Sequence, residues 1–535
     1  MSSFGWREAL VAWLAMSGIA FFLYEPALHG PLLSDDFIYF SGRSYMEALT
    51  FANVRTILDP FGDPVVLTWN WAPLHLLAHS VLRALFGDFS ATYPHHVANV
   101  VVHGLNATLL LALLARCGVP LAAAAAGALL FLVHPANVES VAWIFQLKTL
   151  LAFAFGFGAL LCLVRRPALA TLLFACGLLV KPSAAAVLAA AIVFEAQRAP
   201  AAGDSPRRTG WLVAWGALFL AYALPEFIAF RNTGEFQLPL PVSQRVLGGV
   251  AIVGRYAVLA LSSIGASSFH QPAPPASPLD PWFALGLVTL LALGAVSLLA
   301  LVRRHPAAPW LGLAAASYAP VSQVFAFRYP MADRYLYFVL AGALGAALVT
   351  LAPRLRGRAS ALAGGAVALA LVAAFAARAH ERAAVFGSAD RFERDAALHY
   401  PDGLAGQLAR ARTALAREDV DGALTALEAA HAQGYRNALV MLRDPDFAAL
   451  HGQPRFTALA QQMAREWIAQ YEALPRKVPD AQIDLVQYQL LLDQREAALA
   501  TLDRLAAMPD RVPPALVQQL RRQLEQQAGR NERAP

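Results

Sequence analysis

Two adjacent carboxylates, Asp35 and Asp36, follow the first hydrophobic segment of the chain, which runs from Ala9 to Tyr24. A charged side chain beside a lipid bilayer is costly, so by default it marks a functional site. A carboxylate can take the proton of a hydroxyl while that hydroxyl attacks an electrophilic carbon. Since sequence neighbours on regular structure do not face the same point, we expect only one base. Asp36 is favoured because it lies nearer the helical segment, which leaves Asp35 to cap a helix, orient an acceptor or bind a metal.

Further polar side chains interrupt the hydrophobic sequence downstream. Basic groups of this kind can hold a phosphate leaving group and stabilise its developing charge. Each residue also has an ordinary structural interpretation, because lysines snorkel and arginines anchor helices at membrane interfaces. Their convergence on one predicted face of the membrane favours substrate binding. The candidates are His134, Glu139, Lys148, Lys181, Arg255, Asp333 and Arg334.

Two histidines, His75 and His79, are the candidates for a metal site. They are four residues apart and therefore share one face of a helix. Together with Asp35 they offer a set of metal-ligating groups, although histidines that satisfy hydrogen bonds at a membrane interface are the more common arrangement. The sequence leaves open whether a divalent metal is used, and it requires no other cofactor.

The composition identifies a membrane protein. Of 535 residues, 58% are hydrophobic and only 15% are charged, whereas soluble proteins carry about a quarter charged residues. A spanning helix needs about 20 apolar residues. We therefore predict an all-helical, polytopic protein with eleven spans, at 8–24, 96–115, 119–134, 147–164, 168–181, 183–196, 211–229, 282–302, 308–326, 335–352 and 360–378.

Basic turns orient these spans. Placing them in the cytoplasm satisfies the positive-inside rule, and the net charge of +6 then reflects loop positions rather than nucleic-acid binding. The N-terminus becomes cytoplasmic, and the Asp pair and the C-terminal tail lie outside. The stretch from Val246 to Ile264 is interpreted as an interfacial or re-entrant helix. The basic residues used are Arg165, Arg166, Arg198, Arg207, Arg208, Arg303, Arg304, Arg354, Arg356 and Arg358.

The last part of the chain, 385–535, changes character. Apolar residues recur there at helical spacing among charged ones, and they predict antiparallel helix pairs at Leu404–Leu415 with Val420–His431 and at Ile483–Leu492 with Arg495–Leu505. Such pairs are typical of tetratricopeptide repeats, whose unit is about 34 residues, and such solenoids present a concave surface to protein partners. A plain helical bundle without a partner is the alternative. We thus expect a membrane domain at 1–384, with an outer loop at 25–95, and a helical domain at 385–535.

Six short stretches carry a family resemblance. In this order they resemble the membrane-embedded GT-C glycosyltransferases, and most closely the transmembrane and tetratricopeptide-repeat O-mannosyltransferase-like proteins, including bacterial members. The resemblance is good over roughly 30–200, thin to about 320, and local again at 328–338. The stretches are Trp71–Leu74, Leu85–Gly87, Val100–Ala107, His134–Trp143, Val180–Pro182 and Ala332–Tyr337, of which His134–Trp143 is the most specific.

The resemblance implies a polyprenyl- or dolichyl-phosphate-linked sugar as donor. It also implies that Asp35 and Asp36 take the acid position of the first outer loop, and that repeats lie on the same side of the membrane as the site. Polar positions of the matching motifs fall on Glu139, Lys148, Lys181 and Arg334.

The chain departs from that pattern at three places. Ala72 and Leu147 stand where relatives commonly have arginine, and Phe338-Val339 replaces the usual Leu-Pro. These departures imply that donor-phosphate binding is rearranged or that transfer is lost.

Two functions are therefore expected, an enzyme and a scaffold. The first is a glycosyltransferase of a bacterial inner membrane, acting at the periplasmic face on a hydroxyl, above all of protein Ser or Thr, with mannose as the family-based choice of sugar. The second is a catalytically degenerate anchor that presents the C-terminal helices to a protein partner. Lipid-linked donor, membrane lipids and an acceptor protein are the expected partners, and nucleic acid is not. A transporter is less favoured, because the polar residues cluster at one edge of the membrane instead of near its middle.

Overall fold

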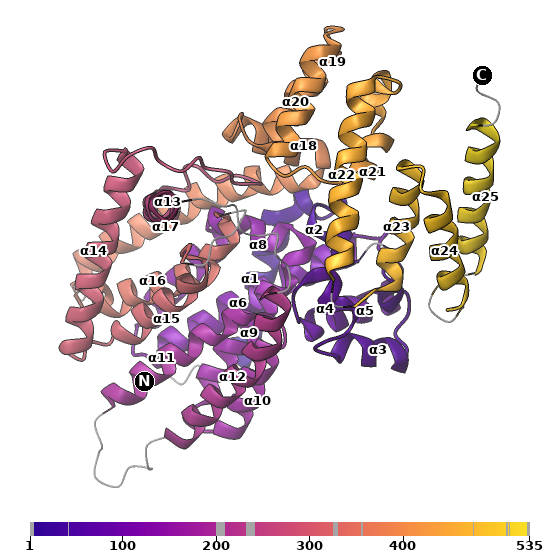
Figure 1. Cartoon of the computed structure of the whole chain (residues 1–535). Helices are drawn as coiled ribbons and strands as arrows, with labels where there is room; N and C mark the ends of the chain where they lie inside the picture. The colour runs from indigo at the N-terminus through magenta and orange to yellow at the C-terminus, as the bar shows by residue number, and fades with distance from the viewer. Residues whose placement is uncertain are drawn as a thin grey trace. The chain divides into compact units, whose positions relative to one another are not determined.

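The computed structural model describes residues 5–40, 42–198, 209–231, 241–324, 330–354, 357–474, 476–509, 512 and 514–531. Every regular element within those ranges is a helix, as Figure 1 shows. The predicted helical class is confirmed. Of the basic turn residues, Arg207, Arg208 and Arg356 lie outside the described ranges.

Eight helices of the described residues are long and apolar enough to cross a membrane, which makes the chain a helical, multi-pass membrane protein. A ninth segment, Leu121–Val133 followed by Pro135–Ala142, passes the same test as a pair bent by 53°. Pro135 explains the bend, because the residue before a proline favours an extended backbone. The eight are Trp6–Ala27, Tyr93–Arg116, Ile144–Cys162, Thr209–Ile228, Val242–Ser262, Pro281–Val302, Asp333–Arg354 and Arg358–Gly387.

Three of the eleven predicted spans correspond to shorter helices. α10 (Pro167–Leu178) and α11 (Ala186–Gln197) are separated by the 3-10 turn Pro182–Ala185, and α15 covers only Ala308–Tyr318. Pro182 and Pro320 end regular hydrogen bonding at these breaks, since proline lacks the backbone donor. α15 packs between α11 and α16 (Leu336–Leu351).

The helix α13 (Val242–Ser262) differs from the interfacial interpretation, because its length and composition qualify it as a span. It packs along α14 (Pro281–Val302) through two glycines. A Cβ on Gly286 would lie 1.9 Å from the Val250 carbonyl oxygen, and one on Gly254 would lie 2.4 Å from that of Trp282. Small residues that let two backbones approach closely are typical of helix contacts in membranes.

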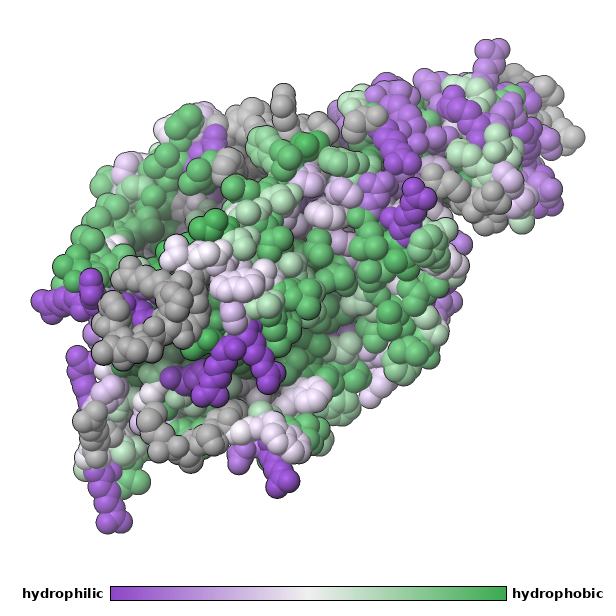
Figure 2. Space-filling model, turned by 90° about the horizontal axis from the view of Figure 1, so that it is seen from below, coloured by the Kyte–Doolittle hydropathy of each residue, from purple (hydrophilic) through white to green (hydrophobic). Residues whose placement is uncertain are grey.

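Several membrane helices expose apolar side chains outward, as the broad hydrophobic surface in Figure 2 illustrates. α14 and α17 (Arg358–Ala383) carry many of them, including Leu291, Val302 and Leu369. Lipid tails are the solvent that such surfaces suit, so these faces agree with a membrane location.

The described chain divides into two compact units. The membrane unit comprises 1–36, 71–227 and 234–395, and the second unit comprises 37–70, 228–233 and 396–535. The remaining helices of the membrane unit are α1 (Trp6–Tyr24), α5 (Pro73–Phe86), α6 (Tyr93–Arg116), α7 (Leu121–Val133), α8 (Val138–Ala142), α9 (Leu147–Cys162) and α12 (Thr209–Arg231). Three helices run through a boundary between the units, α2 (Asp35–Tyr39), α12 and α18 (Ala389–His399).

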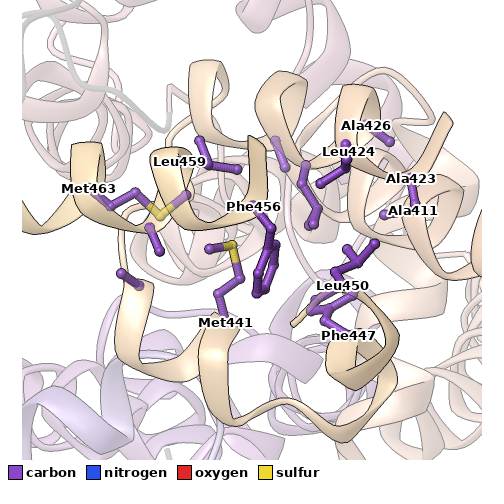
Figure 3. Packing of buried hydrophobic residues seen from close by; sticks show 14 of the residues in the cluster. Ala411, Ala423, Leu424, Ala426, Met441, Phe447, Leu450, Phe456, Leu459 and Met463 are labelled. Carbon is purple, nitrogen blue, oxygen red and sulfur yellow. The ribbon is translucent and has the colours of Figure 1, made fainter. Parts of the chain in front are cut away.

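The second unit contains the helix pairs expected from the sequence. α19 (Leu404–Leu415) packs on α20 (Val420–Ala432), and α23 (Pro479–Leu491) packs on α24 (Arg495–Ala506). Met441, Phe447, Phe456 and Met463 fill a core between α20 and the later helices, as seen in Figure 3. The other elements of this unit are α3 (Phe51–Leu58), α4 (Asp63–Thr68), α21 (Ala438–Arg443), the 3-10 turn Pro445–Leu450, α22 (Pro454–Ala473) and α25 (Pro514–Asn531).

Candidate functional site

The Asp pair begins α2, and the two carboxylates differ in their surroundings. Asp36 is fully buried, and its Oδ2 accepts hydrogen bonds from the Leu33 backbone at 2.8 Å and from the Trp143 indole at 3.1 Å. Burial raises the pKa of the Asp36 carboxyl to about 8, although the hydrogen bond from Leu33 opposes this shift. Asp35 is only partly buried. Of the two, Asp35 is the carboxylate that a substrate can reach.

A run of short helical pieces after α7 supplies the next side chains. His134 ends α7 in an extended conformation, and the pieces Pro135–Asn137, Val138–Ala142 and Ile144–Gln146 follow before α9. Asn99 on α6 fixes this run, because its amide donates to the backbone carbonyls of Val141 and Trp143 at 3.0 and 2.8 Å. The Trp143 indole is thereby positioned to donate to Leu33 and Asp36.

Glu139 and Arg334 form a buried ion pair within this region. The Arg334 backbone donates to Glu139 Oε2 at 2.7 Å, and its guanidinium donates to the other carboxylate oxygen. The side chain of Glu139 is 2% exposed and that of Arg334 is 20% exposed. The guanidinium also lies over the Trp143 ring, 5.4 Å from the ring centroid. Arg334 thus joins the short turn Asp333–Tyr335 to the Glu139 segment.

Two lysines lie where helices begin after a break. Lys148 is in the first turn of α9, with its ammonium 3.6 Å from the centroid of the Phe145 ring. Lys181 precedes Pro182 in an extended conformation, and its ammonium donates to the Thr149 hydroxyl at 2.7 Å. The two ammonium groups repel each other electrostatically. An anion bound between them would relieve that repulsion.

Glu226 is a further carboxylate at the site, and the sequence analysis missed it. It lies on α12 after Pro225, accepts hydrogen bonds from the Trp71 backbone and the Tyr222 hydroxyl, and interacts electrostatically with Lys148. The Trp71 and Tyr222 rings stack at 5.7 Å. The sequence could have indicated Glu226, because a carboxylate within an apolar span marks a functional site by default.

These groups form one constellation of charges within the membrane unit, which we call the charged site. Its cations are Lys148, Lys181 and Arg334, and its carboxylates are Asp35, Asp36, Glu139 and Glu226. Electrostatic interactions link Lys148 to Asp35, Glu226 and Arg334, and they link Arg334 to Asp35. The structure therefore brings together residues that are up to 299 positions apart in sequence, from Asp35 to Arg334.

The histidine candidates lie beside the charged site. His75 and His79 on α5 are both fully buried, and burial lowers the pKa of each well below its usual value. His79 Nδ1 lies 2.9 Å from Nδ1 of His95 on α6, while the His75 ring contacts the Phe145 ring edge-on. Within the described ranges, no group of three or more His, Cys, Asp or Glu side chains has an arrangement suited to a metal ion.

Three predicted substrate-binding residues have partners elsewhere. His134 accepts from the Ala136 backbone and bonds the Ala260 carbonyl, so it caps the helical break. Asp333 pairs with buried His270 at 2.6 Å. The Arg255 guanidinium on α13 lies over the Trp282 ring at 4.6 Å. These contacts fix local structure, and none of them joins the residue to Lys148 or Lys181.

No family model, no curated protein and no solved structure matches the chain. The fold and the charged site define a helical, multi-pass membrane protein with buried ionisable groups at breaks between its helices.

Proposed function

We propose that the chain is a membrane glycosyltransferase with a polyprenyl-phosphate-linked sugar as donor. It moves the sugar, with mannose as the first choice, to a hydroxyl of an acceptor protein. The proposed location is the periplasmic face of a bacterial inner membrane. The single observation that carries this proposal is the convergence of three cations and a reachable carboxylate in one buried site.

The cations suit a phosphate leaving group. As the bond between the anomeric carbon and the phosphate oxygen breaks, negative charge develops on the phosphate. Lys148 and Lys181 lie close enough to repel each other, and they would both gain from that charge. Arg334 is already paired with Glu139, so its guanidinium supports the site more as a fixed positive group than as a flexible ligand.

Asp35 is the proposed base. The acceptor hydroxyl attacks the anomeric carbon, its proton passes to the Asp35 carboxylate, and polyprenyl phosphate leaves with the electron pair of the broken bond. This assignment reverses the preference for Asp36 drawn from the sequence. Asp36 is fully buried and holds Leu33 and Trp143, so we assign it the task of fixing the loop that carries Asp35.

The C-terminal helices serve the acceptor in this proposal. Their tetratricopeptide-like pairing supports a role in binding a protein or peptide partner. The donor would enter from the lipid, since the apolar outer faces of the membrane unit suit lipid contact.

A degenerate scaffold is the second candidate function. Ala72 and Leu147, which stand in place of arginines expected from the resemblance, are both buried and apolar. With those positions filled, the site has two fewer cations for a donor phosphate, which favours an anchor without activity.

Intact-mass spectrometry of periplasmic proteins separates the two functions. Cells carrying the natural chain are compared with cells carrying Asp35→Asn, and with cells carrying Asp88→Asn, an exposed carboxylate in the loop after α5. Equal membrane levels of all three chains are required. The enzyme predicts a hexose-sized mass that only Asp35→Asn removes. The same masses in all three strains would support the scaffold.

A further inference from the structure

Residues 37–70, which we call the strap, belong to the C-terminal unit although they lie between two parts of the membrane unit in sequence. The unit that contains them continues at 396–535. Asp36, just before the strap, and Trp71, just after it, both belong to the membrane unit. The strap therefore belongs to one unit, while the chain continues from each of its two ends directly into a residue of the other.

Polar contacts hold the strap at two separate points. The Ser44 backbone and hydroxyl donate to Asp480 Oδ2 at 3.3 and 3.4 Å, and Asp480 is buried at the start of α23. Asp63 has a side chain that is 3% exposed, and it pairs with Arg476 at 3.4 Å. Since a buried carboxylate is costly unless it is paired or hydrogen-bonded, both contacts specify where the strap lies.

Apolar contacts hold the end of the strap. Val66 and Leu67 on α4 pack against a small core that includes Tyr471, Val478 and Leu485. The strap also closes on itself, because the Tyr39 hydroxyl bonds the Thr68 carbonyl at 3.4 Å. A change at this core therefore reaches residues close to both ends of the strap.

The backbone is unfavourable near both ends of the strap. Ser34 has a φ of 46° and Trp69 a φ of 52°, a left-handed conformation that residues other than glycine rarely adopt. Such conformations persist only where surrounding structure imposes them. Beyond these points, the Asp36 carboxylate accepts from Leu33, and the Glu226 carboxylate accepts from Trp71.

We propose that the strap is a positioning element, through which contacts within the C-terminal unit set the placement of the two flanking segments, Asp35-Asp36 of the charged site and Trp71, which donates to Glu226. Ser44, Asp63, Arg476 and Asp480 are then positioning residues. The consequence for catalysis rests on the proposed function. A protein bound to the C-terminal unit would influence the proposed base through the strap, so that acceptor binding and chemistry are coupled.

Hydrogen–deuterium exchange of the full chain in lipid nanodiscs tests this directly. The amides of Leu33 and Trp71 report on the two ends, because each donates to a carboxylate of the charged site. Asp480→Ala is expected to speed exchange at peptides covering these two amides about tenfold. Arg455→Ala is the matched control, because it removes an exposed ion network in the same unit and leaves the strap contacts in place.

Two further variants guard against misfolding. Asp480→Asn keeps an oxygen that accepts from Ser44, and it is expected to restore slow exchange. Ser44→Ala removes only the hydroxyl contact and serves if Asp480→Ala does not fold. Faster exchange confined to 37–70 would overturn the proposal. So would exchange at the Leu33 and Trp71 amides that neither Asp480→Ala nor Ser44→Ala changes. Hydrogen exchange can be measured whether or not the chain is a transferase. If the proposed function failed, the natural chain would show no transfer, while Asp480→Ala would still speed exchange at the Leu33 and Trp71 amides.

Discussion

The membrane unit buries many ionisable side chains beside its apolar core, whereas the core of α19 to α22 is almost wholly apolar. The C-terminal core of α19 to α22 is built from Ala, Leu, Met and Phe on regular amphipathic helices. The membrane unit exposes much of its apolar surface and buries carboxylates, lysines and histidines where its helices break. Ionised groups in lipid need partners inside the protein, whereas water accommodates them at the surface of a soluble domain.

This difference separates stability from function. The apolar core of the C-terminal unit stabilises that unit by burial alone. The buried charges of the membrane unit contribute little net stability, because the desolvation of each charge offsets its pairing. Three variants test this difference in stability between the two units.

The largest effect on stability is expected from Arg334→Met, which leaves the Glu139 carboxylate buried without its ion-pair partner. Removing one member of a buried pair costs about 3–5 kcal/mol. We expect a clear fall of the Tm in nanodiscs, followed by differential scanning fluorimetry. The double variant with Glu139→Gln should recover most of the loss. A Tm unchanged by Arg334→Met would show that the ion pair is solvated. The membrane unit would then not differ from the C-terminal unit by burying charged pairs.

A slightly smaller effect is expected from Leu427→Ala in the apolar core. Leu427 is fully buried on α20, and such truncations cost about 2–5 kcal/mol. The loss should be confined to the C-terminal unit, so hydrogen exchange should accelerate in α19 to α22 and stay unchanged in α6 and α9. Val440→Ala, at an exposed position, is the control. Faster exchange throughout the membrane helices would show that the two units unfold together.

The smallest effect is expected from Asp36→Asn, and it depends on pH. The pKa of Asp36 is about 8 in the folded chain, above the value of an exposed carboxyl, so the folded state favours the protonated form. The contribution of Asp36 to the free energy of unfolding is therefore most favourable below about pH 4, and it declines as the pH rises towards about 8. The Asn variant cannot ionise. Its Tm should exceed that of the natural chain by more at about pH 9 than at about pH 6, and a difference independent of pH would contradict the burial of an ionisable Asp36.

The two regions also differ in how far the sequence predicts them. The helix expected at Leu404–Leu415 matches α19, and the one expected at Val420–His431 ends one residue short of α20. Polar and apolar residues alternate there with helical period, and Asp419 caps α20 by accepting from the Gly422 backbone. Local signals of that kind are sufficient for an amphipathic helix in water.

In the membrane unit such signals do not mark where several of the helices end. The spans expected at 168–181, 183–196 and 308–326 correspond to short helices, because uniformly apolar sequence hides the positions at which proline breaks them. The residue types of the charged site were predicted, but their arrangement was not. Glu226 was missed because its partners Trp71 and Lys148 are far away in sequence, and only the fold brings these residues together.

Transfer by the purified chain is the most direct test of the proposed glycosyltransferase activity. The chain in nanodiscs is mixed with synthetic polyprenyl-phosphate mannose and Ser- and Thr-containing periplasmic peptides, and the release of polyprenyl phosphate is measured. We expect release by the natural chain and by Asp88→Asn. We expect a rate about 10²–10⁴-fold lower for Asp35→Asn with donor binding retained. Donor binding without release by the natural chain, or equal release by Asp35→Asn, would contradict the proposal.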